Sequence, residues 1–182
     1  MTLLRFEGVA MRRGGRLLLE DVDLAVGAGD ALQVTGPNGS GKSSLIRLAA
    51  GLLGAERGSV ERSPLALADD ALALDREMPL QRALRFWGGN PEVAMDALGL
   101  SPLAESPVRL LSSGQQKRAT LARVVASGAA LWLLDEPLNA LDSEGAKRLG
   151  DIVAHHLASG GGVLAASHHP LPGNWRTLEL RP

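Results

Sequence analysis

The residues best placed to do chemistry form the stretch GPNGSGKSS, from Gly36 to Ser44. It matches the pattern G-x-x-x-x-G-K-[ST], in which glycines let backbone N–H groups curve around phosphate oxygens. The lysine of this pattern reaches the β- and γ-phosphates of a nucleotide, and the next hydroxyl is a Mg²⁺ ligand. The spacing therefore predicts a nucleoside triphosphate site with Mg²⁺. Its expected lining residues are Gly36, Pro37, Asn38, Gly39, Ser40, Gly41, Lys42, Ser43 and Ser44.

A second candidate group ends the apolar run ALWLLDEP at residues 130–137. Such a run predicts a strand buried on both faces, which would carry Asp135 and Glu136 to the sheet edge where ligands bind in open α/β sheets. Asp135 is expected to hold Mg²⁺ together with Ser43, directly or through water. Glu136 is expected to polarise an attacking water as a general base. The alternative is an Asp-Glu pair that caps a helix before Pro137.

A third stretch, LSSGQQKR at residues 111–118, places small hydroxyls and a glycine before a helical run. This order suits an anion-binding helix N-terminus. Because Lys42 already marks a phosphate site, a second anion site in one small domain needs an explanation.

The elements that must position these residues alternate along the chain. Short apolar or alternating segments predict strands at residues 3–9, 17–26, 31–35, 58–61, 65–68, 130–137, 161–167 and 176–180. Helical spacing predicts helices at residues 43–53, 79–88, 91–99, 115–128 and 143–158. This alternation indicates an α/β fold with a mainly parallel central sheet, into which residues 70–128 are inserted as a helical lobe.

The bulk composition narrows the function classes. The chain has 182 residues, 45% of them hydrophobic, and a formal net charge of −1. These values are typical of one globular core and lack the basic excess of nucleic-acid binders. The absence of cysteine excludes a disulfide framework and a catalytic cysteine. Arg5 and Glu7 interrupt the first apolar stretch, and no stretch approaches the roughly 18 apolar residues of a membrane span. We therefore expect neither nucleic-acid binding nor direct membrane insertion.

Taken in order, the motifs resemble those of ABC transporter ATP-binding subunits. Residues 111–115 are similar to the signature L-S-G-G-Q, with Ser113 in place of the first glycine, a small residue that we expect to be tolerated. NALD at residues 139–142 resembles the D-loop, and His168, directly after the strand at 161–167, resembles the switch histidine. The resemblance covers essentially the whole chain. His155, His156 and His169 lack such support and are expected at the surface.

The resemblance implies a P-loop ABC ATPase fold with an antiparallel β edge beside the parallel sheet. Residues 1–182 would form one ABC ATPase domain, with a catalytic core at 1–69 and 129–182 and a helical signature subdomain at roughly 70–128. ATP with Mg²⁺ would be the bound nucleotide. The implied catalytic residues are Lys42, Glu136 and His168.

The resemblance also answers the question of the second anion site. It implies a homodimer that sandwiches two ATP molecules, in which one chain completes the site of the other through Ser112, Gly114, Gln115 and Asp142. It further implies an integral membrane permease subunit as partner. The chain would then be peripheral on the cytoplasmic face of the bacterial inner membrane.

Within the family, the chain is most similar to the ATP-binding subunits of cytochrome c maturation exporters. Their usual E-L-T-A-x-E-N-L-R-F-Y is matched by EMPLQRALRFW at residues 77–87. This similarity implies a role in heme export or cytochrome c biogenesis. The alternatives are the ATPase of another transporter, a non-transport ABC clamp, and a regulatory nucleotide-binding module.

Two departures from the family pattern bear on function. Asp69 and Asp70 stand where many members carry the Q-loop glutamine, which puts that route of coupling to the membrane subunit in doubt. The chain also has no tyrosine, so the aromatic residue that usually stacks on adenine is missing. Arg13 falls near that place, where its guanidinium plane could stack on the base. The alternative for Arg13 is an ordinary surface arginine.

Overall fold

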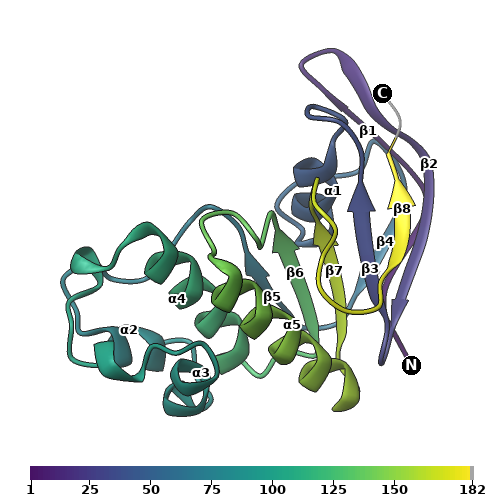
Figure 1. The fold of residues 1–182 in the computed structure, drawn as a ribbon. Coiled ribbons are helices and arrows are strands. Elements are labelled where there is room, and N and C mark those ends of the chain that lie inside the picture. The colour runs from purple at the N-terminus through teal and green to yellow at the C-terminus, as the bar shows by residue number, and fades with distance from the viewer. Residues whose placement is uncertain (181–182) are drawn as a thin grey trace.

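The centre of the protein is a five-stranded sheet in which every pairing is parallel. In the computed structural model, which describes residues 1–180, its strands follow the order β5-β6-β7-β3-β8 (Figure 1). Their bounds are β3 Ala31–Thr35, β5 Leu65–Ala68, β6 Leu131–Asp135, β7 Gly162–Ala166 and β8 Arg176–Glu179. The carboxyl ends of these strands therefore meet at one edge of the sheet.

A second, antiparallel sheet has the order β2-β1-β4. Its strands are β1 Thr2–Arg13, β2 Arg16–Gly27 and β4 Arg57–Arg62. Gly14 and Gly15 form the tight turn of the β1–β2 hairpin, and both have the positive φ that such a turn requires. The α/β fold with an antiparallel β component is thus confirmed.

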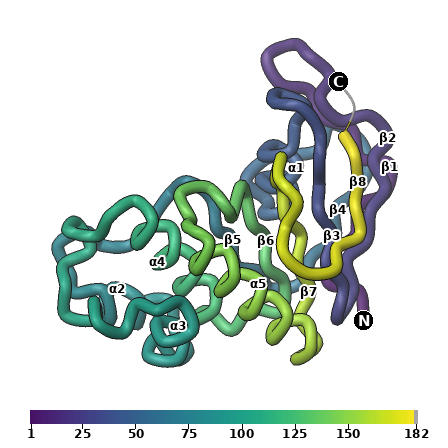
Figure 2. Tube along the Cα trace, viewed as in Figure 1, coloured from purple at the N-terminus to yellow at the C-terminus, as the bar shows by residue number. Residues whose placement is uncertain are grey.

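Within residues 1–180, five α-helices connect these strands: α1 Lys42–Ala49, α2 Leu80–Arg85, α3 Pro91–Ala97, α4 Ser113–Ala126 and α5 Ser143–Ala158. Short 3₁₀ helices cover Ser101–Leu103 and Val108–Leu110. Helices α2, α3 and α4 gather on the β5 side of the molecule, away from the antiparallel sheet (Figure 2). Among residues 1–180, no helix combines the length and apolar character needed to cross a bilayer.

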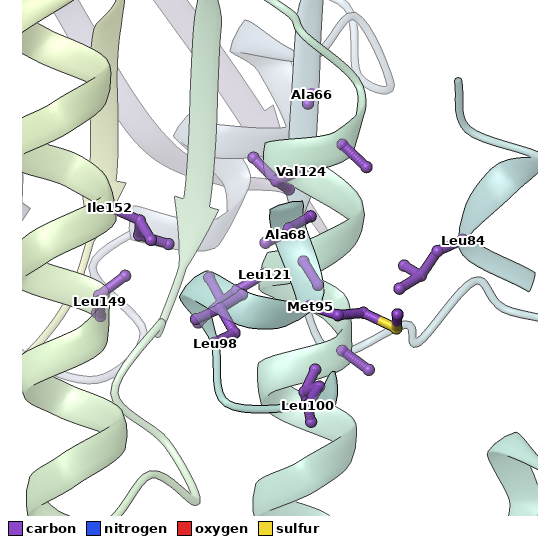
Figure 3. Close-up of a cluster of buried hydrophobic side chains, with 14 of the residues drawn as sticks. Ala66, Ala68, Leu84, Met95, Leu98, Leu100, Leu121, Val124, Leu149 and Ile152 are labelled. Atoms are coloured by element: carbon purple, nitrogen blue, oxygen red, sulfur yellow. The ribbon is translucent and has the colours of Figure 1, made fainter. Parts of the chain in front are cut away.

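The core lies on both faces of the central sheet. On β6, Leu131 and Leu133 join the apolar cluster that includes α1 and the antiparallel sheet. The alternating residues Trp132 and Leu134 join the cluster shared by α2 to α5. Figure 3 shows part of this second cluster, where side chains of the helices meet β5. The prediction of a strand buried on both faces is confirmed, because all five residues of β6 are buried.

Each predicted strand and helix has a counterpart in the structure, with differences at the ends. Helix α1 ends at Ala49, short of the predicted residue 53, because Gly51 leaves helical geometry with a φ of +77°. Helix α4 begins earlier than predicted, at Ser113, because Ser112 is its N-cap. The predicted division of the chain into a core and a helical subdomain at residues 69/70 and 128/129 stays a prediction.

The expectation of a surface position is wrong for His156, although His155 and His169 are exposed. His156 is half-buried, and its ring stacks on Trp132 with 3.8 Å between ring centroids and 9° between planes. Its Nε2 lies 3.2 Å from the Ala130 carbonyl oxygen. Burial lowers the pKa of His156, while the backbone contacts partly oppose the shift.

This packing predicts a pH-dependent stability. Because the pKa of His156 is lower in the folded than in the unfolded chain, the unfolded state binds the proton more readily. The contribution of His156 to stability is therefore present above its unfolded pKa and is lost as the pH falls. In thermal unfolding between about pH 8 and 5, His156→Phe should remove a slope of at most about 1.4 kcal/mol per pH unit. His155→Gln is the matched control, and an unchanged slope in His156→Phe would contradict the assignment.

Candidate nucleotide-binding site

The loop between β3 and α1 has the backbone geometry that its glycines predict. Gly36, Gly39 and Gly41 have φ values of 138°, 81° and 100°. Residues other than glycine rarely adopt such positive values. A Cβ at Gly36 would lie 2.5 Å from the Leu180 carbonyl oxygen, so this position also lacks room for one. The loop can therefore curve tightly and end at the N-terminus of α1, where free backbone N–H groups favour an anion.

Lys42 is the first residue of α1, directly after this loop, and only 6% of the residue is exposed. Its Nζ donates to the carbonyl oxygens of Gly36, at 2.8 Å, and Pro37, at 3.0 Å. The ammonium group is thus held across the loop by two backbone acceptors. This position places a positive charge where the sequence predicts the phosphates.

Ser43 and Asp135 bring the end of β6 to the start of α1. The Ser43 hydroxyl donates to Asp135 Oδ1 at 3.0 Å. Burial raises the pKa of the Asp135 carboxyl, and the hydrogen bond from Ser43 opposes part of this effect. The carboxyl group lies in a place that penalises its own negative charge, which a nearby cation would relieve.

The Ser43–Asp135 pair fits Mg²⁺ by its chemistry. Mg²⁺ prefers oxygen ligands and usually takes one or two of them from the protein, with phosphates and water completing the octahedron. Residues 1–180 contain no group of three or more His, Cys, Asp or Glu side chains that could hold a metal. A hydroxyl and a carboxylate beside a phosphate loop match the magnesium requirement without such a group.

Glu136 and His168 meet at the ends of neighbouring strands. Glu136 follows β6 with a φ of +45°, and its backbone N–H donates to the Ala166 carbonyl oxygen, at the end of β7, at 2.8 Å. His168 Nδ1 lies 2.9 Å from Glu136 Oε2. The turn at Glu136 thus aims its carboxylate across the strand ends at the predicted switch histidine.

The residues predicted to act on the partner's nucleotide lie apart from this group. Ser112, Gly114, Gln115 and Asp142 line a small pocket of their own, which contains none of the residues that surround Lys42. In this pocket Ser112 Oγ accepts from the Gln115 N–H at 3.3 Å, and Gln115 Oε1 accepts from the Ser112 N–H at 2.8 Å. Asp142 accepts from the Gly145 N–H at 2.7 Å as the N-cap of α5. The pocket thus lies between the N-termini of two helices.

Arg13 is exposed at the end of β1, beside the hairpin turn. The hairpin lies against the phosphate loop, since a Cβ at Gly41 would be 3.4 Å from the Leu18 carbonyl oxygen on β2. This neighbourhood is compatible with a contact between Arg13 and a nucleotide base. Stacking on adenine stays a prediction.

Sequence reasoning missed two buried polar residues next to these motifs. Lys117 on α4 is 8% exposed, and its Nζ donates to the Asp135 carbonyl oxygen at 3.3 Å. Burial lowers the pKa of Lys117, while the carboxylates of Asp70 and Asp135 oppose this shift. The other missed residue is Gln33 in β3, which is 5% exposed. A polar residue inside an apolar strand was the available signal for Gln33, whereas Lys117 resembled an ordinary helix-surface lysine.

The chain matches known proteins over most of its length. A family model described as ABC transporter matches residues 19–139. The cytochrome c biogenesis ATP-binding export protein CcmA of Sphingopyxis alaskensis is 53% identical over 177 residues, covering 93% of this chain and 91% of that protein. The protein of the same description from Pseudomonas putida is 38% identical over 205 residues, covering 99% of this chain and 98% of that protein.

Solved structures support the fold. A structure described as the ATP binding subunit of an ABC transporter superposes with a TM-score of 0.82 over 92% of this chain and 80% of that chain. The sequence identity in that comparison is 22%, so it bears on the fold alone. A nucleotide-free ATP-binding cassette from an ABC transporter superposes with a TM-score of 0.79, over 93% of this chain and 82% of that chain at 22% identity.

Proposed function

This chain belongs to the ABC transporter family, among the cytochrome c biogenesis ATP-binding export proteins, and we propose that its ATP hydrolysis energises an export step of cytochrome c biogenesis. The observation that carries the proposal is the convergence of two pairs at one sheet edge. Ser43 and Asp135 are 3.0 Å apart, and Glu136 and His168 are 2.9 Å apart, next to the loop that holds Lys42. Few other chemistries need a phosphate loop, a metal-binding pair and a base together.

In the proposed reaction a water molecule attacks the γ-phosphate in line with the bond to the β-phosphate. The backbone N–H groups of the loop and the ammonium of Lys42 stabilise the negative charge on the phosphate oxygens. Glu136 orients the water and takes its proton, and His168 contacts the γ-phosphate beside it. The positive φ of Glu136 turns its side chain toward His168, and the contact between the two side chains holds the carboxylate in one orientation. Both features support these roles.

Ser43 and Asp135 would hold Mg²⁺, which neutralises phosphate charge when it is bound with ATP. The carboxylate and hydroxyl supply two of the oxygen ligands that the ion prefers.

On the adenine side, Arg13 would lay its guanidinium plane on the base in place of the missing tyrosine. The exposed side chain on the hairpin beside the phosphate loop supports this assignment.

The complete site would form between two copies of this chain. Ser112, Gly114, Gln115 and Asp142 line a pocket away from Lys42, so within one chain they have no nucleotide to contact. A head-to-tail dimer would place this pocket of one copy over the phosphate loop of the other. The ordered N-terminus of α4 would then point free N–H groups at the partner's γ-phosphate.

The cargo would cross the membrane through a permease subunit, to which this chain would bind on the cytoplasmic face of a bacterial inner membrane. Following the resemblance of residues 77–87, we propose heme as the cargo class.

A complementation experiment tests this function. In a bacterium that lacks its own cytochrome c biogenesis ATP-binding subunit, expression of this chain should restore c-type cytochromes, measured by heme staining of separated proteins. Lys42→Ala should restore none, because the phosphate charge is no longer stabilised. Lys147→Ala, at an exposed position on α5, is the matched control. Measurable ATP hydrolysis without restored cytochromes would disprove the cytochrome c role and leave the ATPase in place.

A further inference from the structure

Gln33 occupies an unusual place for an amide side chain. It lies in the middle of β3, where it pairs with Ala165 of β7 and Thr177 of β8, and it is 5% exposed. Its neighbours Leu32 and Val34 are buried in the apolar cluster on one face of the sheet, so Gln33 points to the other face. A buried amide costs free energy unless its donors and its acceptor find partners.

Among residues 1–180, the hydrogen-bond partners of the Gln33 amide come from the segment that carries His168. Gln33 Nε2 donates to the His169 carbonyl oxygen at 2.8 Å and lies 3.4 Å from the Ser167 carbonyl oxygen. Gln33 Oε1 accepts from the Leu171 N–H at 3.3 Å. The amide therefore holds the backbone on both sides of His168.

Residues 167–175, which include His168, form neither a helix nor a strand. Because β7 and β8 are both parallel to β3, residues 167–175 must return along the face of the sheet to start β8 (Figure 1). Such a crossover is usually a helix, in which backbone groups bond to one another. Here the Gln33 amide bonds to backbone groups of Ser167, His169 and Leu171, and the Ser167 hydroxyl accepts from the His169 N–H at 3.1 Å.

Resting on the proposed ATPase mechanism, we propose that Gln33 is a positioning residue for His168. By bonding the chain before and after His168, the amide sets where the imidazole meets Glu136 and, with ATP bound, the γ-phosphate. The histidine is itself exposed, with 43% of its side chain accessible, and its imidazole contacts the Glu136 carboxylate and the ring of His169. The buried side chain of Gln33 thus governs the position of the exposed side chain of His168.

The test compares Gln33→Met with the wild type in steady-state ATP hydrolysis by the full chain. Methionine keeps the length and volume of the side chain and removes its donors and its acceptor. We expect kcat to fall about 10- to 100-fold, the range that misplacement of a reacting group produces, while KM for ATP stays close to the wild-type value. Gln33→Asn, which keeps the amide on a shorter side chain, should fall between the two.

A double substitution separates positioning from loss of stability. If Gln33 acts through His168, adding Gln33→Met to His168→Ala should lower kcat little further. Ile152→Ala, a buried core change away from the site, controls for a comparable loss of melting temperature. In ¹H–¹³C spectra of the imidazole Cε1–Hε1 groups, the His168 signal, assigned by its absence in His168→Ala, should shift in Gln33→Met.

The possible outcomes are distinct. A wild-type kcat in Gln33→Met, or an equal loss of kcat in both backgrounds, would overturn the inference while the ATPase function stands. A wild-type chain without ATP hydrolysis would instead overturn the proposed mechanism. If Gln33→Met does not fold, kcat and the His168 signal are measured in Gln33→Asn instead. Wild-type values of both would overturn the inference.

Discussion

Replacing Glu136 with glutamine is expected to lower steady-state ATP hydrolysis by a factor of about 10² to 10⁴, the usual contribution of a general base. The amide keeps the size of the carboxylate and can still bond to His168 Nδ1, which lies 2.9 Å from Glu136 in the wild type. It cannot take a proton from water. Binding of ATP should therefore persist, since Lys42 and the phosphate loop are unchanged.

The measurement for Glu136 is phosphate release at saturating ATP, together with the affinity for a fluorescent ATP analogue. Glu144→Gln is a suitable control, because Glu144 is an exposed glutamate whose carboxylate lies 3.0 Å from Arg148 on the same helix. Wild-type turnover in Glu136→Gln would remove Glu136 from the role of base. Loss of nucleotide affinity would mean that Glu136 acts in binding.

Mixing two inactive variants is expected to restore ATP hydrolysis if the sites are shared between chains. Lys42→Ala would remove the proposed phosphate contact, and in the proposed dimer Ser112→Asp would place a carboxylate against the partner's γ-phosphate. Aspartate is as good an N-cap as serine, so α4 should keep its N-terminus in the second variant. Each variant alone should be inactive.

A mixed dimer of these variants has one doubly defective site and one intact site. With random pairing of equal amounts, about one quarter of all nucleotide sites should be intact. Turnover should therefore recover to about one quarter of the wild-type value. Recovery would be measured at increasing total concentration, with each single variant as control. If verified mixed dimers show no recovery, the two-chain site is wrong.

The nucleotide loop and the acidic strand end could be predicted from the sequence because each lies within one contiguous stretch. The spacing from Gly36 to Ser43 encodes both the glycines that permit positive φ and the residues that are predicted to contact phosphate and metal. The apolar run before Asp135 likewise predicts a buried strand, and all of β6 is buried. The prediction for His156 was wrong for the opposite reason. Its stacking on Trp132 depends on a helix packing against a strand, which lies outside any one contiguous stretch.

The sequence alone therefore determined the fold class, the phosphate loop and the order of the motifs, because local spacing sets backbone geometry and the face that each side chain occupies. Only the tertiary structure decided which distant residues meet. The strand order puts β7 between β6 and β3, and this order joins Glu136 to His168 and Gln33 to the loop around that histidine. Such contacts depend on the pairing and register of strands far apart in the chain, which no single stretch of residues specifies.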